Sequence, residues 1–235
     1  GKDMVYMLSA SYILYYYQDL LGVSSWVMGV ILMAARIFDA FNDPIMGVVV
    51  AKTQTKWGKF RPWLLIGTVL NAIVLFFMFA VPKSVTGGGL AAYAAILYIT
   101  WGITYTMMDI PFWSMIPAFT EGGKERENLS TLARSCAGVG SAIITVITMI
   151  CVPKLGGIGN ADKAALVAAG NAEGAADGVK LAGIEAGRII ERSGFKWFAL
   201  IIAILFVVFI TVTCICIKEK STVNMQSPTV GQMFK

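Results

Sequence analysis

The segment from Arg36 to Asp43 carries three charged side chains inside an otherwise apolar run of residues. At about 100° per residue along a helix, Arg36, Asp39 and Asp43 lie on one face, with the two carboxylates one turn apart. A charge at the centre of a membrane span costs roughly 2.5–3.5 kcal/mol on insertion scales. If the run crosses a membrane, this face must therefore meet partner side chains, water or ions.

Two carboxylates one turn apart predict a cation site. Repulsion between Asp39 and Asp43 is relieved when a proton or a cation sits between them, and hard cations such as Na⁺ prefer oxygen ligands. Asn42 can add an amide oxygen. We therefore expect Na⁺, Li⁺ or H⁺ at Asp39 and Asp43. The alternative is an Arg36–Asp39 ion pair with Asp43 at the membrane edge, which leaves the second aspartate unexplained.

A lone carboxylate, Asp109, lies in a later apolar run and shares a helical face with Tyr105 and Trp113. A carboxylate accepts hydrogen bonds from sugar hydroxyls, and an aromatic ring stacks on the apolar face of a pyranose. The face therefore predicts a sugar site. Alternatively, the two aromatic residues belong to an interfacial belt and Asp109 pairs with Arg36 or Arg134. Arg134 could also extend to the membrane surface without any further role.

The elements that must position these residues are apolar helices. Apolar residues make up 57% of the chain and charged residues 14%, with a mean hydropathy of +0.72, whereas soluble domains carry about 25% charged residues. A membrane span needs about 20 mostly apolar residues. Six segments come near this length: 3–18, 26–51, 62–82, 90–117, 131–152 and 196–217. We expect an all-α membrane protein with six transmembrane helices.

Basic residues in the short loops predict the orientation of these helices. The loop after the second segment is the most basic, so it and both chain ends are predicted to face the cytoplasm. The Ala- and Gly-rich segment 154–195 is then outside, as a mobile surface loop or with a short helix near 178–192. The net charge of +5 reflects these loops, because no basic stripe with interleaved aromatic residues indicates nucleic-acid binding.

The sequence offers little for covalent chemistry. It contains no histidine, and its four cysteines lie in apolar runs without paired spacing. No phosphate loop, metal-ligand cluster or nucleophile–base pair is visible. We expect no enzyme activity and no cofactor, apart from a coupling ion.

Three motifs carry a family resemblance: RIFDAFNDPIMG, KWGKFRPW and YTMMDIPFWS. Together they resemble the glycoside–pentoside–hexuronide cation symporters of the major facilitator superfamily, over nearly the whole chain. The resemblance implies the amino-terminal six-helix bundle of a major facilitator fold at 1–217. Residues 218–235 would be the cytoplasmic central linker and the start of a second half. The segment 154–195 is longer than the family pattern leads one to expect.

The resemblance also implies roles for individual residues. The cation-binding positions are Asp39, Asp43, Asn42 and Thr106. The positions that contact sugar or line its cavity are Lys2, Asp3, Tyr105, Asp109, Trp113 and Arg134. Arg36 is a charge-pairing residue, and a gating loop contains Lys56, Gly58, Lys59 and Arg61. Without the resemblance, Lys2 and Asp3 are only a terminal flank, and positive-inside anchoring explains the loop equally well.

These observations predict a secondary symporter of the cell membrane that couples uptake of a sugar or glycoside to Na⁺, Li⁺ or H⁺. In the family the cavity lies between two halves, so we expect this chain to supply one wall and to need a second six-helix half. The expected partners are the substrate, the cation and the lipid bilayer, with no nucleic acid. A carrier of the same fold for a lipid or another solute, and a membrane enzyme or receptor, are the alternatives. The Asp109 and Trp113 pair favours a sugar over a lipid.

Overall fold

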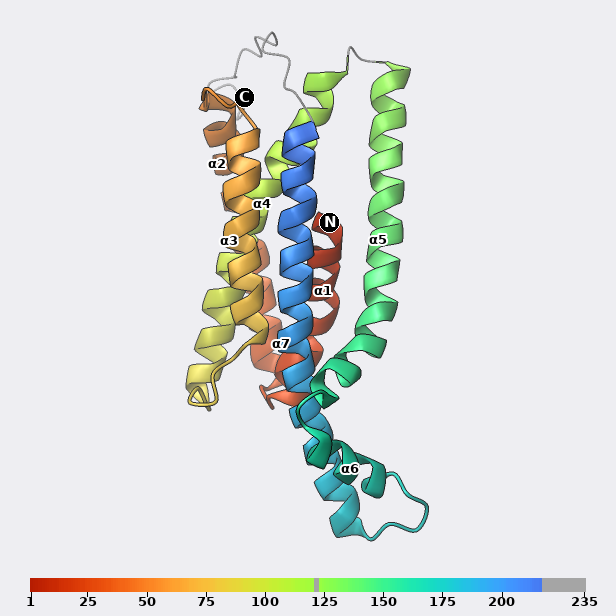
Figure 1. Cartoon of the computed structure of the whole chain (residues 1–235). Helices are drawn as coiled ribbons and strands as arrows, with labels where there is room; N and C mark the ends of the chain where they lie inside the picture. The colour runs from red at the N-terminus through yellow and green to blue at the C-terminus, as the bar shows by residue number, and fades with distance from the viewer. Residues whose placement is uncertain (121–122, 217–235) are drawn as a thin grey trace.

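The computed structural model describes residues 1–120 and 123–216, and helices account for all their regular structure. The elements are α1 Lys2–Tyr15, the π-helical turn η1 Tyr16–Leu20, α2 Ser25–Lys52, α3 Arg61–Phe79, α4 Gly88–Phe119, α5 Lys124–Gly157, α6 Ala161–Gly170 and α7 Asp177–Cys216 (Figure 1). The predicted linker 218–235 lies outside the described residues. The all-α fold is thus confirmed.

Five helices are long and apolar enough to cross a membrane: α2, α3, α4, α5 and α7. The shorter α1 continues through η1 and covers the first predicted segment, 3–18. The helices run up and down, so α2 ends and α3 begins at one end of the bundle, where α4 also ends (Figure 1). Short connections make this the natural arrangement for neighbouring helices. It agrees with the six-helix topology predicted from the sequence.

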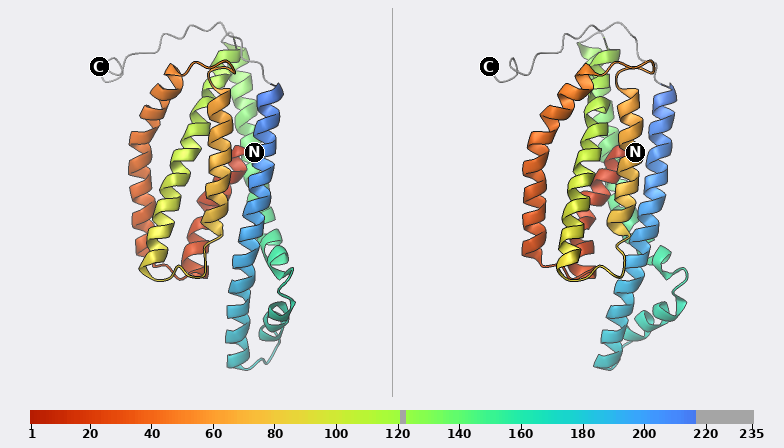
Figure 2. Two further views of the ribbon diagram at one scale, coloured as in Figure 1. Left: turned by 60° about the vertical axis from the view of Figure 1, so that its left-hand side comes forward. Right: turned by 90° about the vertical axis from the view of Figure 1, so that its left-hand side faces the viewer.

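The segment 154–195 is largely helical, so the expectation of a mobile surface loop there is wrong. The short helix expected near 178–192 is the first part of α7, which runs on into the sixth span. Together α6 and this part of α7 project beyond the end of the bundle (Figures 1 and 2). Alanine has the highest helix propensity, and a side chain on Gly170 would lie 3.1 Å from the Cα of Gly183. Composition that looked like a loop therefore builds a closely packed helix pair.

Glycine also sets the crossing of α5 and α7. A Cβ atom on Gly156 would overlap the carbonyl oxygen of Ile190, and one on Gly194 would overlap that of Val152. The two backbones can approach this closely only without side chains. This crossing joins α5 to the remainder of the bundle at the end from which the α6–α7 pair projects (Figure 1).

Four polar side chains donate to carbonyls in the last turn of α3 and just beyond it, and we call them the tyrosine cap. The final carbonyls of a helix have no donor within the helix. Here the donors are Tyr16 to Phe79 O (2.7 Å), Tyr17 to Met78 O (3.0 Å), Tyr93 to Phe77 O (2.9 Å) and Arg192 to Val81 O (2.8 Å). The π-helical turn η1 leaves Tyr16 and Tyr17 both fully buried although they are adjacent in sequence. The cap therefore ties α3 to η1, α4 and α7.

Candidate functional site

The site residues predicted from the sequence lie on α1, α2, α4 and α5, and most of them form two groups. The carboxylate group comprises Arg36, Asp39, Asp43 and Thr106. The lysine group comprises Lys2, Asp3, Asp109, Trp113 and Arg134. Helix α4 takes part in both, because Thr106 and Asp109 lie one turn apart on it.

In the carboxylate group, α2 and α4 are linked through Asp43. The hydroxyl Oγ1 of Thr106 donates to Asp43 Oδ1 at 3.0 Å. Arg36 Nη1 lies 3.7 Å from Asp39 Oδ2, but the arginine side chain is 58% exposed, and exposed ion pairs contribute only about 0–1 kcal/mol. The pairing predicted for Arg36 is therefore present and weak. Arg36 does not pair with Asp43. An Arg36–Asp39 ion pair, the alternative to a cation site, therefore still does not explain the second aspartate.

Asp39 is held against α4 at a glycine. A Cβ atom on Gly102 would lie 2.8 Å from Asp39 Oδ1, closer than real Cβ contacts allow. Any larger residue at Gly102 would push the carboxylate away. The close approach of α2 to α4 at Asp39 thus depends on the absence of a side chain.

Asn42 precedes Asp43 on α2 and carries a buried polar atom. Its Nδ2 is buried and has no hydrogen-bond partner among residues 1–120 and 123–216, although buried polar groups nearly always have one. Rotating the side-chain amide of Asn42 by half a turn exchanges its nitrogen and oxygen, so that the oxygen takes the position of Nδ2. Two carboxylates, this amide and the Thr106 hydroxyl are oxygen donors suited to a hard monovalent cation. Within the described residues, no group of three or more His, Cys, Asp or Glu could hold another kind of metal.

The lysine group is built around a buried amine. The Lys2 side chain is only 5% exposed, and its Nζ lies 2.7 Å from Asp109 Oδ1 and 3.4 Å from Asp3 Oδ1. A buried charge needs such partners, because leaving one unpaired costs several kcal/mol. Across the described part of the chain, the ion-pair partner of Asp109 is therefore Lys2 rather than Arg36 or Arg134, the two that the sequence offered as an alternative.

Both cations of this group contact the same indole. Lys2 Nζ lies 4.7 Å from the centre of the Trp113 ring, and Arg134 Cζ lies 5.1 Å from it. Lys2 also lies 5.0 Å from the Phe112 ring. Cations within about 6 Å of an aromatic face are attracted to it. Trp113 thus links α4 to α5 through Arg134 and to α1 through Lys2.

Tyr105 belongs to an aromatic cluster beside the lysine group. Its ring stacks on Trp101 with centroids 5.3 Å apart and lies 5.4 Å from the ring of Tyr6. Sequence reasoning missed Tyr6, Trp101, Phe112 and Gly102. Helical spacing could have found two of them, since Trp101 precedes Tyr105 by four residues and Tyr6 follows Lys2 by four.

The predicted gating loop lies at the end of α2, apart from both groups. Gly58 has φ +109°, a conformation that favours glycine, and its carbonyl accepts a 2.6 Å hydrogen bond from Thr55 Oγ1. Lys56 is exposed, Lys59 Nζ lies 5.7 Å from the Phe60 ring, and Arg61 begins α3. The loop is thus an ordered turn, and its gating role stays a prediction.

Comparison with known proteins identifies the family of the chain. The family model described as MFS/sugar transport protein matches residues 1–235, so the chain belongs to that family. With its long apolar helices, this makes it a multi-pass protein of the cell membrane.

Three relatives illustrate the similarity. The isoprimeverose transporter of Lactiplantibacillus pentosus is 32% identical over 155 residues, which are 66% of this chain and 32% of the relative. The inner membrane symporter YicJ of Escherichia coli K12 is 32% identical over 146 residues, 62% of this chain and 32% of that protein. The lactose permease of Lactobacillus helveticus is 30% identical over 213 residues, 87% and 29% of the two chains. The chain spans about a third of the length of these relatives.

Proposed function

We propose that this member of the MFS/sugar transport protein family forms one wall of a symporter that carries a sugar or glycoside together with Na⁺, Li⁺ or H⁺. The observation that carries the proposal is the lysine group, in which Asp109 and Trp113 lie within reach of one buried amine. Relatives named as an isoprimeverose transporter and a lactose permease support a sugar rather than a lipid.

The lysine group suits a polyhydroxylated ligand. Asp109 and Asp3 remain partly exposed, so their free oxygens can accept hydrogen bonds from sugar hydroxyls. Trp113 offers a broad apolar ring for the carbohydrate face. Lys2 and Arg134 supply donors for hydroxyl oxygens. Tyr105, stacked on Trp101, completes the aromatic side of this wall.

The carboxylate group suits the cation. Asp39 and Asp43 supply negative charge, and Asn42 and Thr106 supply neutral oxygens. A proton or a monovalent cation relieves the repulsion between the two carboxylates. A cation that binds Asp43 competes with its hydrogen bond from Thr106, so binding changes a contact made by α4.

This shared helix offers a physical route for coupling. Coupling requires that one ligand change the free energy of binding the other. Thr106 responds to the cation, Asp109 contacts the sugar, and one turn of α4 separates them. Binding of the cation can therefore move Asp109 and Trp113 relative to the sugar that they contact.

The opposing wall is, by this proposal, a second six-helix bundle. Arg36, Asp43 and Arg134 are exposed, and exposing these charges to lipid would be costly. Alternating access then arises as two bundles rock around the central site. The chain performs no covalent step, and the proposal assigns it transport and no enzymatic role.

Uptake measurements with the full-length transporter test this proposal. A panel of labelled glycosides is offered to vesicles with and without Na⁺ or Li⁺ at two pH values. We expect concentrative uptake of at least one sugar that a cation gradient drives. Trp113→Ala should abolish it, whereas Trp26→Ala, at an exposed tryptophan on α2, should not. Cation-independent uptake of lipid analogues in place of sugars would contradict the proposal.

A further inference from the structure

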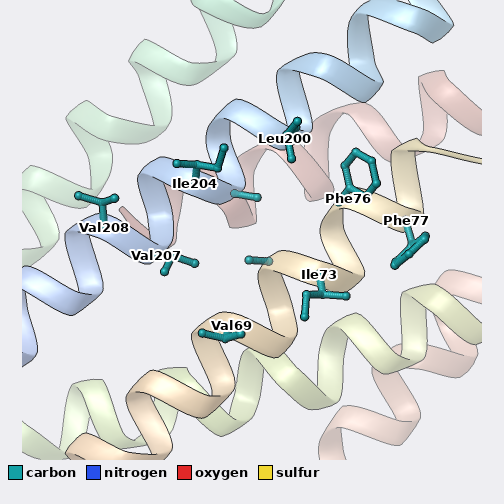
Figure 3. A pocket seen from close by; sticks show the side chains of 10 residues that line it. Val69, Ile73, Phe76, Phe77, Leu200, Ile204, Val207 and Val208 are labelled. Carbon is teal, nitrogen blue, oxygen red and sulfur yellow. The ribbon is translucent and has the colours of Figure 1, made fainter.

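A groove runs between α3 and α7, two helices that contribute no side chain to the carboxylate or lysine group. Its volume is about 420 Å³, and all its lining residues are apolar. They include Val69, Ile73 and Phe76 on one wall and Leu200, Ile204 and Val208 on the other (Figure 3). Pockets of roughly 300–1,000 Å³ are typical of small-molecule sites.

The groove opens on an apolar surface of two helices and is suited to contact the hydrocarbon of the membrane. Both helices are long and apolar enough to span it, and Ile73, Ile204 and Val208 are exposed on the bundle surface. From Leu200 to Val208 the groove extends about 12 Å at 1.5 Å per residue. That is less than half of a hydrocarbon core about 30 Å thick, so the groove fits a chain from a single leaflet.

The basic residue Lys196 lies near one end of this groove. Lys196 precedes Leu200 by one helical turn and so shares its face of α7. Its Nζ lies 5.5 Å from the ring of the exposed Trp197. No charged residue follows between Trp197 and Cys216. A tryptophan beside the last charge before an apolar run marks the depth of the lipid headgroups.

We propose that this groove binds one acyl chain of an anionic phospholipid, whose phosphate pairs with Lys196. The lining suits the chain, but apolar contact alone does not select a lipid, because lipid tails are as apolar as leucine. Selectivity comes from the headgroup, through the charge of Lys196 and the indole of Trp197. This site is separate from the two charged groups and does not depend on the transported solute.

Native mass spectrometry of the full-length transporter tests the site. The purified protein is titrated with phosphatidylglycerol and phosphatidylcholine that carry the same two oleoyl chains. We expect one phosphatidylglycerol to bind about fivefold more tightly, in line with one basic residue near a membrane surface. Lys196→Gln should remove this preference, and Lys154→Gln, in the last turn of α5, should retain it.

Groove-filling variants test where the chain lies. Ile204→Trp and, from the opposite wall, Val69→Trp should reduce binding of both lipids, whereas Val146→Trp on the exposed surface of α5 should not. Equal binding of the two lipids in every variant would overturn the proposal. The proposal would also be overturned if the protein were a dimer that the Ile204→Trp substitution dissociates, since a second copy of the protein would then occupy the groove.

Discussion

The tyrosine cap and the charged groups differ in the burial and in the hydrogen bonding of their polar atoms. In the cap, Tyr16 and Tyr17 are fully buried and each hydroxyl donates to a main-chain carbonyl of α3. In the charged groups, the side chains of Asp39 and Asp109 remain 26% and 29% exposed, and Asn42 keeps a buried polar atom without a partner among the described residues. Satisfied polar atoms stabilise a fold, whereas accessible charges retain the capacity to bind a ligand. Substitutions should therefore separate stability from transport.

The largest effect is expected at Asp109. Asp109→Asn removes the closest partner of buried Lys2 and the main acceptor for sugar hydroxyls. Breaking a fully buried pair costs about 3–5 kcal/mol, but Asp3 still lies 3.4 Å from Lys2, so the loss of stability should be smaller than this. Sugar binding should fall about a hundredfold, because a hydrogen bond to a charged group contributes roughly 1.5–3 kcal/mol. Binding of labelled sugar and a thermal melt measure the two losses.

A double variant separates these two contributions. Lys2→Gln combined with Asp109→Asn removes the amine that has lost its closest partner and should restore much of the thermal stability without restoring sugar binding. Recovery of binding in the double variant would mean that Asp109 acts only as the partner of Lys2.

A smaller, ion-specific loss is expected at Gly102. Gly102→Ala places a methyl group against Asp39 Oδ1, so the carboxylate must move and the cation affinity should fall about tenfold. Sugar affinity in the absence of the coupling cation should change little. Gly29→Ala on α2 is the matched control, since its added Cβ would meet nothing within 4 Å. Equal effects of the two variants on cation affinity would contradict the assignment of Asp39.

A loss of stability without a change in transport is expected when the tyrosine cap is altered. Tyr16→Phe leaves the Phe79 carbonyl without its 2.7 Å donor, and an unsatisfied buried acceptor costs about 1–3 kcal/mol. The melting temperature should fall by several degrees while sugar and cation affinities stay unchanged. A shift in the cation dependence of uptake would instead place the cap within the transport mechanism.

The smallest effect is expected at Thr106. Thr106→Ala removes a neutral hydrogen bond to Asp43, worth about 0.5–1.5 kcal/mol, so cation affinity should fall roughly twofold to tenfold. Thr106→Ser keeps the hydroxyl and should behave like the unchanged protein. Cation titrations of sugar binding compare the three proteins.

The same contrast explains what the sequence could and could not predict. Charges in apolar helices are costly, so Asp39, Asp43 and Asp109 could be recognised before any contact was known. Lys2 could not, because its burial depends on the tertiary contact between α1 and α4. Gly102 carries no chemical signal, and its importance arises only where Asp39 approaches it.

The fold shows a similar division. Hydropathy identified the long helices, since each must bury its backbone polar groups in hydrogen bonds of its own. The segment 154–195 was misjudged because alanine and glycine are common both in flexible loops and in closely packed helices. Only the backbone contacts at Gly170 and Gly183 distinguish the two.

The central claim is that cation and sugar bind at separate groups coupled through α4. Its most direct test is the sugar affinity of the full-length transporter at zero and saturating coupling cation, for the unchanged protein and for Asp43→Cys. The account predicts that the cation tightens sugar binding in the unchanged protein. It also predicts that Asp43→Cys keeps the cation-free affinity and loses both this increase and ion-driven accumulation. Full cation stimulation in Asp43→Cys, or complete loss of its sugar binding, would contradict it.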